Sequence, residues 1–183
     1  MLKEKKKILK RIRVEWRNLT SEYLSLRDVE LKALQLFNEE ISFRAKKENV
    51  DLEFKPEKKE KQDKTSVNEE EIKSIFREIA KKSHPDKIEK YDQDIFIESA
   101  KAKKEGEISK LIDNAIKLNV NVDGISFRQI EQMEREVDSL KLDIKNIIES
   151  IHWKWYHETN KNKGALINNI LNNIKHGNKK NKN

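Results

Sequence analysis

Apolar residues recur every three or four positions over two long stretches of this 183-residue chain. The first row comprises Leu9, Ile12, Trp16, Leu19, Tyr23 and Leu26, and the second comprises Ile130, Met133, Val137, Leu140, Ile144, Ile147 and Ile151. We call each row a seam. The spacing places each seam on one face of an α-helix, at the a and d positions of a coiled coil. It predicts two long amphipathic helices, one near each end of the chain.

Neither helix can bury its seam alone, so each needs an apolar partner. We expect the two helices to pair with each other as an antiparallel hairpin within one chain, because the segment between them has to return the chain. Parallel dimerisation through either seam, which would give a homodimer, is the alternative. Glu30 and Ala33 weaken the first seam before Phe37 and Ile41 resume an apolar face, which predicts a change of packing partner midway. Phe127 extends the second seam at its start.

The composition favours helices over a large compact core. Charged residues make up 40% of the chain and hydrophobic residues 35%, which is little apolar material for a core spanning the whole length. Only four glycines and two prolines occur, so the turn residues that an all-β fold needs at each corner are missing. We therefore predict an all-α fold.

Several classes of protein are disfavoured by what the sequence lacks. There is no cysteine for a disulfide or a thiolate metal site, and no apolar run that resembles a signal peptide or spans a bilayer. No paired carboxylates in an apolar setting, glycine-rich phosphate loop or nucleophile constellation is present. We expect a soluble, cytoplasmic protein that is not an enzyme and that holds neither a cofactor nor a metal.

The charge pattern and the residues that start or end helices predict five segments. Residues 46–68 carry dense mixed charge and Pro56, as a linker does, and Asn68 followed by Glu71 is typical of a helix start. Pro85 must end that helix at Ser83 or His84. The predicted segments are an N-terminal coiled-coil helix (1–45), the linker (46–68), a small helical domain (69–118), a C-terminal coiled-coil helix (123–160) and a basic tail (161–183).

The helix predicted over 69–83 has two distinct faces. Its apolar stripe comprises Ile72, Ile75, Phe76 and Ile79. Lys73, Arg77 and Lys81 follow one another at intervals of four and form a basic stripe. A solvated surface is the ordinary explanation of such a stripe, but this one leads directly to the tripeptide His84-Pro85-Asp86.

At this point the sequence resembles the J-domain family, the DnaJ-like cochaperones of DnaK-type ATPase chaperones. The family's second helix and following loop have the pattern Ile-Lys-x-x-Tyr-Arg-x-Leu-Ala-x-x-Tyr-His-Pro-Asp-Lys. This chain has Ile72-Lys73-x-x-Phe76-Arg77-x-Ile79-Ala80-x-x-Ser83-His84-Pro85-Asp86-Lys87. Ser83 in place of the aromatic residue is the main departure. The family's first-helix opening and basic fourth-helix ending have no counterpart here, so the resemblance is confined to a reduced motif flanked by coiled-coil helices.

The resemblance implies a short helical hairpin whose loop docks on a DnaK-type chaperone and stimulates its ATP hydrolysis. The residues that would bind the chaperone are Lys73, Arg77, Lys81, Lys82, His84, Pro85, Asp86 and Lys87. Asp86 would accept charge-assisted hydrogen bonds, and the cations would speed encounter with an acidic surface. The first alternative is a coiled-coil scaffold or adaptor in which the hairpin only packs.

A nucleic-acid-binding protein that uses its two basic ends is the second alternative. Residues 1–17 hold eight Lys or Arg against two acids, and residues 161–183 hold six Lys against none. We expect only weak, non-specific binding to nucleic acid. The tail should form a docked amphipathic helix through Leu166, Ile167, Ile170, Leu171 and Ile174, with its last residues from His176 disordered.

Three aromatic residues, Trp153, Trp155 and Tyr156, stand beside His152 and His157 at the end of the second seam. We expect them to form the packed cap of a bundle, with a surface for a client protein as the alternative. A metal site is disfavoured, because a spacing of five is poor for one helix face and no acid cluster supports it.

Overall fold

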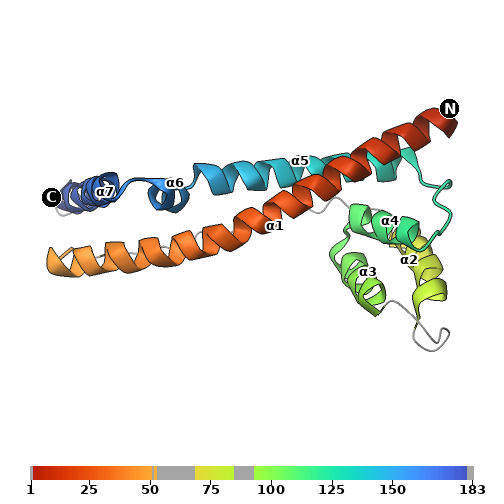
Figure 1. Ribbon diagram of the computed structural model, residues 1–183, viewed down its shortest axis with the longest axis horizontal. Helices are drawn as coiled ribbons and strands as arrows, with labels where there is room; N and C mark the ends of the chain where they lie inside the picture. The colour runs from red at the N-terminus through yellow and green to blue at the C-terminus, as the bar shows by residue number, and fades with distance from the viewer. Residues whose placement is uncertain (1, 51, 53–68, 85–92, 181–183) are drawn as a thin grey trace. The chain divides into compact units, whose positions relative to one another are not determined.

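The computed structural model describes residues 2–50, 52, 69–84 and 93–180. These residues form seven α-helices and no strand, so the all-α prediction is confirmed (Figure 1). The helices are α1 (Leu2–Lys47), α2 (Glu69–Ser83), α3 (Gln93–Glu105), α4 (Ile108–Lys117), α5 (Phe127–Glu149), α6 (Ile151–His157) and α7 (Asn160–Lys180). The predicted helix over 69–83 and the long N-terminal helix are therefore present.

The chain forms two compact units. Unit 1 comprises Met1–Thr20 and Glu60–Lys141, and unit 2 comprises Ser21–Lys59 and Leu142–Asn183. Helices α1 and α5 each contribute one part to either unit. Each unit has its own apolar cluster, so each is described by itself.

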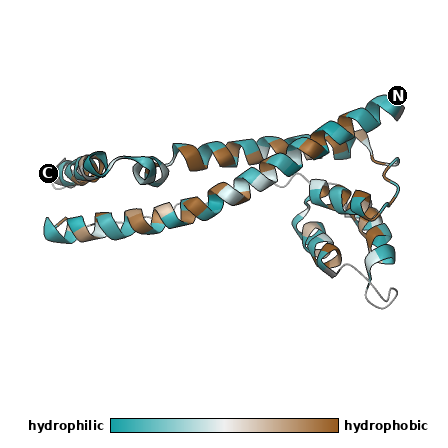
Figure 2. Cartoon of the chain, viewed as in Figure 1, coloured by the Kyte–Doolittle hydropathy of each residue, from teal (hydrophilic) through white to brown (hydrophobic). Residues whose placement is uncertain are grey.

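In unit 1, helices α2, α3 and α4 contact one another and share one core with the beginnings of α1 and α5. Fully buried members of this core include Ile79 of α2, Met133 of α5 and Leu111 of α4. Figure 2 shows how apolar and polar residues alternate along α1 and α5. The alternation arises because each helix buries only one stripe.

The start of α1 and the start of α5 run in the same direction, so the predicted antiparallel pairing is wrong. Three ion pairs fix this direction in unit 1: Lys6–Asp123 (2.8 Å), Arg11–Glu134 (3.6 Å) and Glu15–Lys141 (2.8 Å). The physical reason lies in the segment between the helices. Helix α4 binds α1, and the turn that follows places Asp123 beside Lys6, so α5 begins where α1 begins. The prediction of pairing within one chain is correct.

The predicted change of packing partner along α1 is confirmed, because Leu9 and Ile12 belong to the core of unit 1 whereas Phe37 and Ile41 belong to that of unit 2. The two residues that weaken the seam are not exposed, however. Glu30 and Ala33 are both buried, as are Phe37 and Ile41 beyond them. Glu30 can be buried because its carboxylate pairs with Arg27 and lies 3.3 Å from the ring of His152, both in unit 2. A buried acid with such partners extends a seam that a purely apolar pattern ends.

In unit 2, the second half of α1 packs with α6 and α7. The core comprises Phe37, Ile41, Ala45, Trp155, Ile167 and Leu171. Arg44 donates to the carbonyl oxygen of Gly164 (3.3 Å) and to the amide oxygen of Asn168 (3.0 Å). As predicted, the amphipathic tail is a docked helix. It continues to Lys180, so the expected loss of order from His176 is wrong for residues 176–180.

The predicted C-terminal coiled-coil helix over 123–160 is broken. Helix α5 ends at Glu149, and Ser150 adopts an extended backbone as the N-cap of α6, where its hydroxyl accepts from the Trp153 N–H at 3.3 Å. Consequently Ile151 leaves the seam and is 48% exposed. Phe127 at the other end is 62% exposed, although Lys5 lies over its ring.

Part of the predicted linker belongs to unit 2. Glu48 pairs with Lys175 at 2.7 Å, and Val50 and Leu52 pack on the core of that unit. Glu48, Val50 and Leu52 are therefore part of the folded unit, although the linker was predicted to begin at residue 46. The remaining linker positions, 51 and 53–68, lie outside the described residues.

Candidate functional site

Helix α2 carries the first part of the candidate site and is fixed by its apolar stripe. Ile72 and Ile79 are buried, and Ile75 and Phe76 pack against the same core. The helical hydrogen bonds of the backbone continue to His84, whose N–H donates to the Ala80 carbonyl oxygen at 2.9 Å. The expected cap at Asn68 lies outside the described residues.

Ser83, which replaces an aromatic residue of the J-domain pattern, is fully buried. Its hydroxyl donates to the Ile79 carbonyl oxygen at 3.0 Å, so the polar atom is satisfied within the helix. The position that is aromatic in the J-domain pattern is therefore a small, buried and hydrogen-bonded residue here.

The ring of His84 lies edge-on against Phe96, with 5.3 Å between the ring centroids. Phe96 in turn contacts Phe76 at 6.0 Å, and Lys103 lies 4.7 Å above the Phe76 ring. These contacts join the end of α2 to α3 and leave His84 half-buried. The other predicted tip residues, Pro85, Asp86 and Lys87, lie outside the described residues.

We call Lys73, Arg77, Lys81 and Lys82 the basic face of α2. All four residues are exposed, and Lys81 pairs with Glu78 one turn earlier. Lys82 differs from the others because its ammonium group donates to the carbonyl oxygens of Leu118 (3.1 Å) and Asn119 (2.7 Å). It therefore caps the end of α4 as well as contributing charge, a role that the sequence pattern did not indicate.

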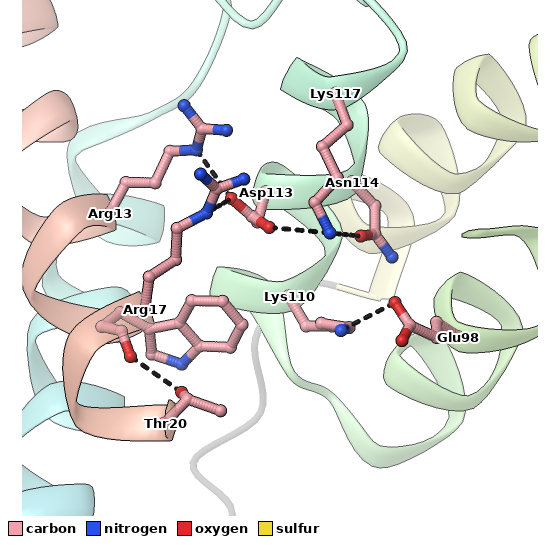
Figure 3. Close-up of polar contacts among 9 residues, drawn as sticks. Arg13, Arg17, Thr20, Glu98, Lys110, Asp113, Asn114 and Lys117 are labelled. Carbon is pink, nitrogen blue, oxygen red and sulfur yellow. Dashed lines mark hydrogen bonds and ion pairs between the residues drawn. The ribbon is translucent and has the colours of Figure 1, made fainter. Parts of the chain in front are cut away.

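A buried carboxylate fastens α4 to α1. Asp113 is 2% exposed, and its Oδ1 accepts from the Nε atoms of Arg13 (2.7 Å) and Arg17 (2.6 Å) (Figure 3). Lys117 lies 3.3 Å from its Oδ2. Burial raises the pKa of Asp113, but the hydrogen bonds from Arg17 and Arg13 outweigh burial and hold that pKa below its usual value.

A second carboxylate holds the other end of α4. Glu136 on α5 accepts from the backbone N–H groups of Ile108 and Ser109, each at 2.9 Å. The N-terminal N–H groups of a helix need such acceptors, and the dipole favours a negative charge there. Burial nevertheless raises the pKa of Glu136.

Neither Asp113 nor Glu136 was predicted from the sequence. A signal for Asp113 was available, because Asp113 and Asn114 stand between Ile112 and Ala115 in an otherwise apolar stretch. The buried amide of Asn114 donates to the Ser99 hydroxyl at 3.0 Å, and Lys110 pairs with Glu98 at 2.7 Å. Together these contacts hold α3 on α4, and thus position the partner helix of α2. Figure 3 shows the pair formed by Lys110 and Glu98.

The aromatic cluster of unit 2 is mainly a packing feature. Trp155 is buried edge-on against Phe37, with 5.5 Å between ring centroids, and Lys163 lies 5.1 Å above its ring. Trp153 and Tyr156 are half-buried. The two histidines take different partners: His152 contacts Glu30 and Ser150, whereas His157 stacks near Trp153 and Tyr156.

The described residues show neither a metal-binding cluster nor a membrane-spanning helix. They contain no group of three or more His, Asp or Glu side chains arranged to hold a metal ion. Nor does any described helix have the length and apolar character needed to cross a membrane.

No protein-family model, curated protein or solved structure matches this chain. The resemblance to the J-domain family therefore depends on residues 72–87 of the sequence. The geometry of α2 and α3 is the structural context in which that resemblance has to be judged.

Proposed function

We propose that this chain is a J-domain-like cochaperone that docks on a DnaK-type ATPase chaperone and stimulates its ATP hydrolysis. The observation that carries the proposal is that α2, whose exposed basic face comprises Lys73, Arg77, Lys81 and Lys82, is followed directly in the sequence by His84-Pro85-Asp86. The proposed contacts are the basic face of α2 and the tripeptide. The chain itself would bind no nucleotide.

The distribution of charge on α2 suits such docking. Lys81 and Lys82 lie in its last turn. Cations at the end of a helix complement the helix dipole, and they place positive charge directly before His84 in the chain. A partner with an acidic surface would be attracted to that end, and Asp86 would supply an acceptor for charge-assisted hydrogen bonds.

The end of α2, up to His84, is also held in place by packing. Buried Ile79 and Ser83 fix the last turn of α2, and the His84–Phe96 contact joins it to α3. Asp113 and Glu136 then hold α4, on which both helices pack. A basic face on a well-packed helix loses little conformational freedom on binding, which favours affinity.

The test is a single-turnover ATPase assay with a DnaK-type chaperone from the same source. We expect the protein to accelerate hydrolysis and Asp86→Asn to reduce that stimulation at least tenfold, a loss of about 1.4 kcal/mol or more. Arg77→Glu should cause a milder loss that shrinks at high salt, since Arg77 contributes long-range attraction. The matched control is Asp138→Asn on α5, whose carboxylate is 77% exposed.

Stimulation that survives in the Asp86→Asn protein would refute the proposal, as would hydrolysis that the parent protein does not accelerate. Equal losses for Asp86→Asn and Asp138→Asn would point to a general charge effect and would also count against it. Thermal unfolding of each variant checks that the fold is retained.

A scaffold or adaptor protein is the second candidate. The observation that favours it is the structural role of Lys82. Its ammonium group belongs to the proposed docking face but caps the end of α4. If the scaffold candidate is correct, Lys82→Gln should destabilise unit 1, and no variant of the tip should alter any ATPase rate.

A further inference from the structure

A cavity of about 250 Å³ lies in unit 1, and no residue of α2 lines it. Its walls come from the first turns of α1, the end of α4 and the turn that precedes α5. The apolar part of the lining comprises Leu9, Ile116, Val122 and Ile125. Leu9 and Ile125 are buried, whereas Ile116 and Val122 are half-buried and so remain partly accessible.

The charged part of the lining is strongly positive. It comprises Lys5, Lys6, Lys10 and Arg13, against the single acid Asp123. Asp123 pairs with Lys6, and Arg13 is engaged by Asp113. Lys10 is exposed and makes no ion pair with any residue that the structure describes. The cavity thus combines an apolar floor with an excess of positive charge.

We propose that this cavity binds an acidic peptide segment of a partner protein, which inserts one apolar side chain between flanking carboxylates. Charge complementarity requires an anionic ligand, and the apolar lining requires an apolar group beside the anion. The site is distinct from the basic face of α2 and does not depend on the proposed docking to a chaperone.

Two dimensions favour a peptide over a small amphiphile. The cavity is smaller than the roughly 300–1,000 Å³ of typical small-molecule sites, so it suits one side chain better than a whole ligand. Lys5 and Lys10, neither of which pairs with an acid among the described residues, are about 7.5 Å apart along α1, at about 1.5 Å per residue. An extended peptide, at about 3.3 Å per residue, presents carboxylates over a similar distance with two or three residues.

The experiment uses the full chain and a fluorescein-labelled peptide, Glu-Asp-Leu-Asp-Glu, with fluorescence anisotropy at physiological salt. A second peptide carries Ser in place of Leu. We expect the Leu peptide to bind at least tenfold more tightly than the Ser peptide. Lys10→Glu and Val122→Asp should each weaken binding of the Leu peptide at least tenfold.

The matched control is Lys7→Glu, an equal charge change at an exposed position of α1 that does not line the cavity. It should change affinity less than threefold, because Lys7 does not line the cavity and only its screened charge would act there. Methyl-labelled isoleucine provides a readout that does not depend on variants. Addition of the peptide should shift the methyl resonances of Ile116 and Ile125 and leave that of Ile167 in unit 2 unchanged.

Equal weakening by Lys7→Glu and Lys10→Glu would overturn the proposal, because it would indicate attraction to the basic end alone. No difference between the Leu and Ser peptides would overturn it as well. Methyl shifts produced by laurate but not by the peptide would replace the peptide with a small amphiphile. The Asp86→Asn protein should bind the peptide as the parent does, so failure of the chaperone proposal and failure of this one give different results.

Discussion

Removal of the charge of Asp113 should loosen unit 1 and leave unit 2 intact. Asp113→Asn keeps the shape of the side chain, but Arg13, which is 20% exposed, loses its ionised partner. A hydrogen bond to a charged group contributes about 1.5–3 kcal/mol, and a neutral amide oxygen restores about 1 kcal/mol of that. Arg17 and Lys117 are 43% and 38% exposed, so solvent screens them and each adds at most about 1 kcal/mol. The expected net cost is about 2 kcal/mol.

Hydrogen exchange resolves the two units, which a single melting curve would average. A loss of about 2 kcal/mol corresponds to exchange about 30-fold faster for amides of α4 that open with unit 1. Amides of α7 in unit 2 should change less than about twofold. Asp138→Asn repeats the chemistry at an exposed carboxylate and should change stability by less than about 0.5 kcal/mol.

The reasoning would be refuted if α4 and α7 exchanged faster to the same extent, or if Asp138→Asn matched Asp113→Asn. A coupling measurement adds a sharper check. In the Asp113→Asn background, Arg13→Gln should cost little more, because the partner of Arg13 has already been removed.

Two further predictions follow from the polar contacts. An NMR titration should place the carboxyl pKa of Asp113 below 3.8 and that of Glu136 above 4.5. The contribution of Asp113 to stability is thus present above pH 3.8 and lost as the pH falls through its folded-state pKa, whereas that of Glu136 is present below pH 4.5 and lost as the pH rises through its own; a raised pKa at Asp113 would contradict its pairing with the two arginines, and a lowered pKa at Glu136 would contradict the dominance of burial there. Ser150→Ala removes the N-cap of α6 and should lower the free energy of unfolding of unit 2 by about 1 kcal/mol, measured by hydrogen exchange of α7 amides, and no change would mean that the break after α5 has another cause.

Local features of the fold were predictable because local rules determine them. Pro85 forces the helix to end before it, and α2 does end at Ser83. The spacing of the seams likewise predicted the long helix α1 and the start of α5. In each of these cases the information lies within a few residues of the feature.

The direction of pairing was not predictable in that way. A heptad pattern states which face of a helix is buried but not the direction of its partner, and the turn that places Asp123 beside Lys6 decides the direction here. The break at Ser150 was missed because the apolar spacing continues through it to Ile151. There the hydroxyl of Ser150 accepts a hydrogen bond from the Trp153 N–H, which ends one helix and starts the next although the apolar spacing continues.

In the candidate site, too, local features were predictable and contacts between distant positions were not. The exposure of Lys73, Arg77 and Lys81 followed from their common face on α2. The contact of Lys82 with the end of α4 joins positions far apart in the sequence, and so does that of Asp113 with Arg13. Periodicity within a single helix carries no information about such pairs.

The most direct test of the central claim is a lysine footprint of the protein mixed with an ATP-loaded DnaK-type chaperone. Acetylation rates of individual lysines, measured by mass spectrometry, should fall severalfold at Lys73 and Lys81 when the chaperone is added at saturating concentration. Lys145, which is 64% exposed on the part of α5 in unit 2, should react at an unchanged rate. Unchanged rates at Lys73 and Lys81, or protection confined to unit 2, would contradict docking through the basic face of α2.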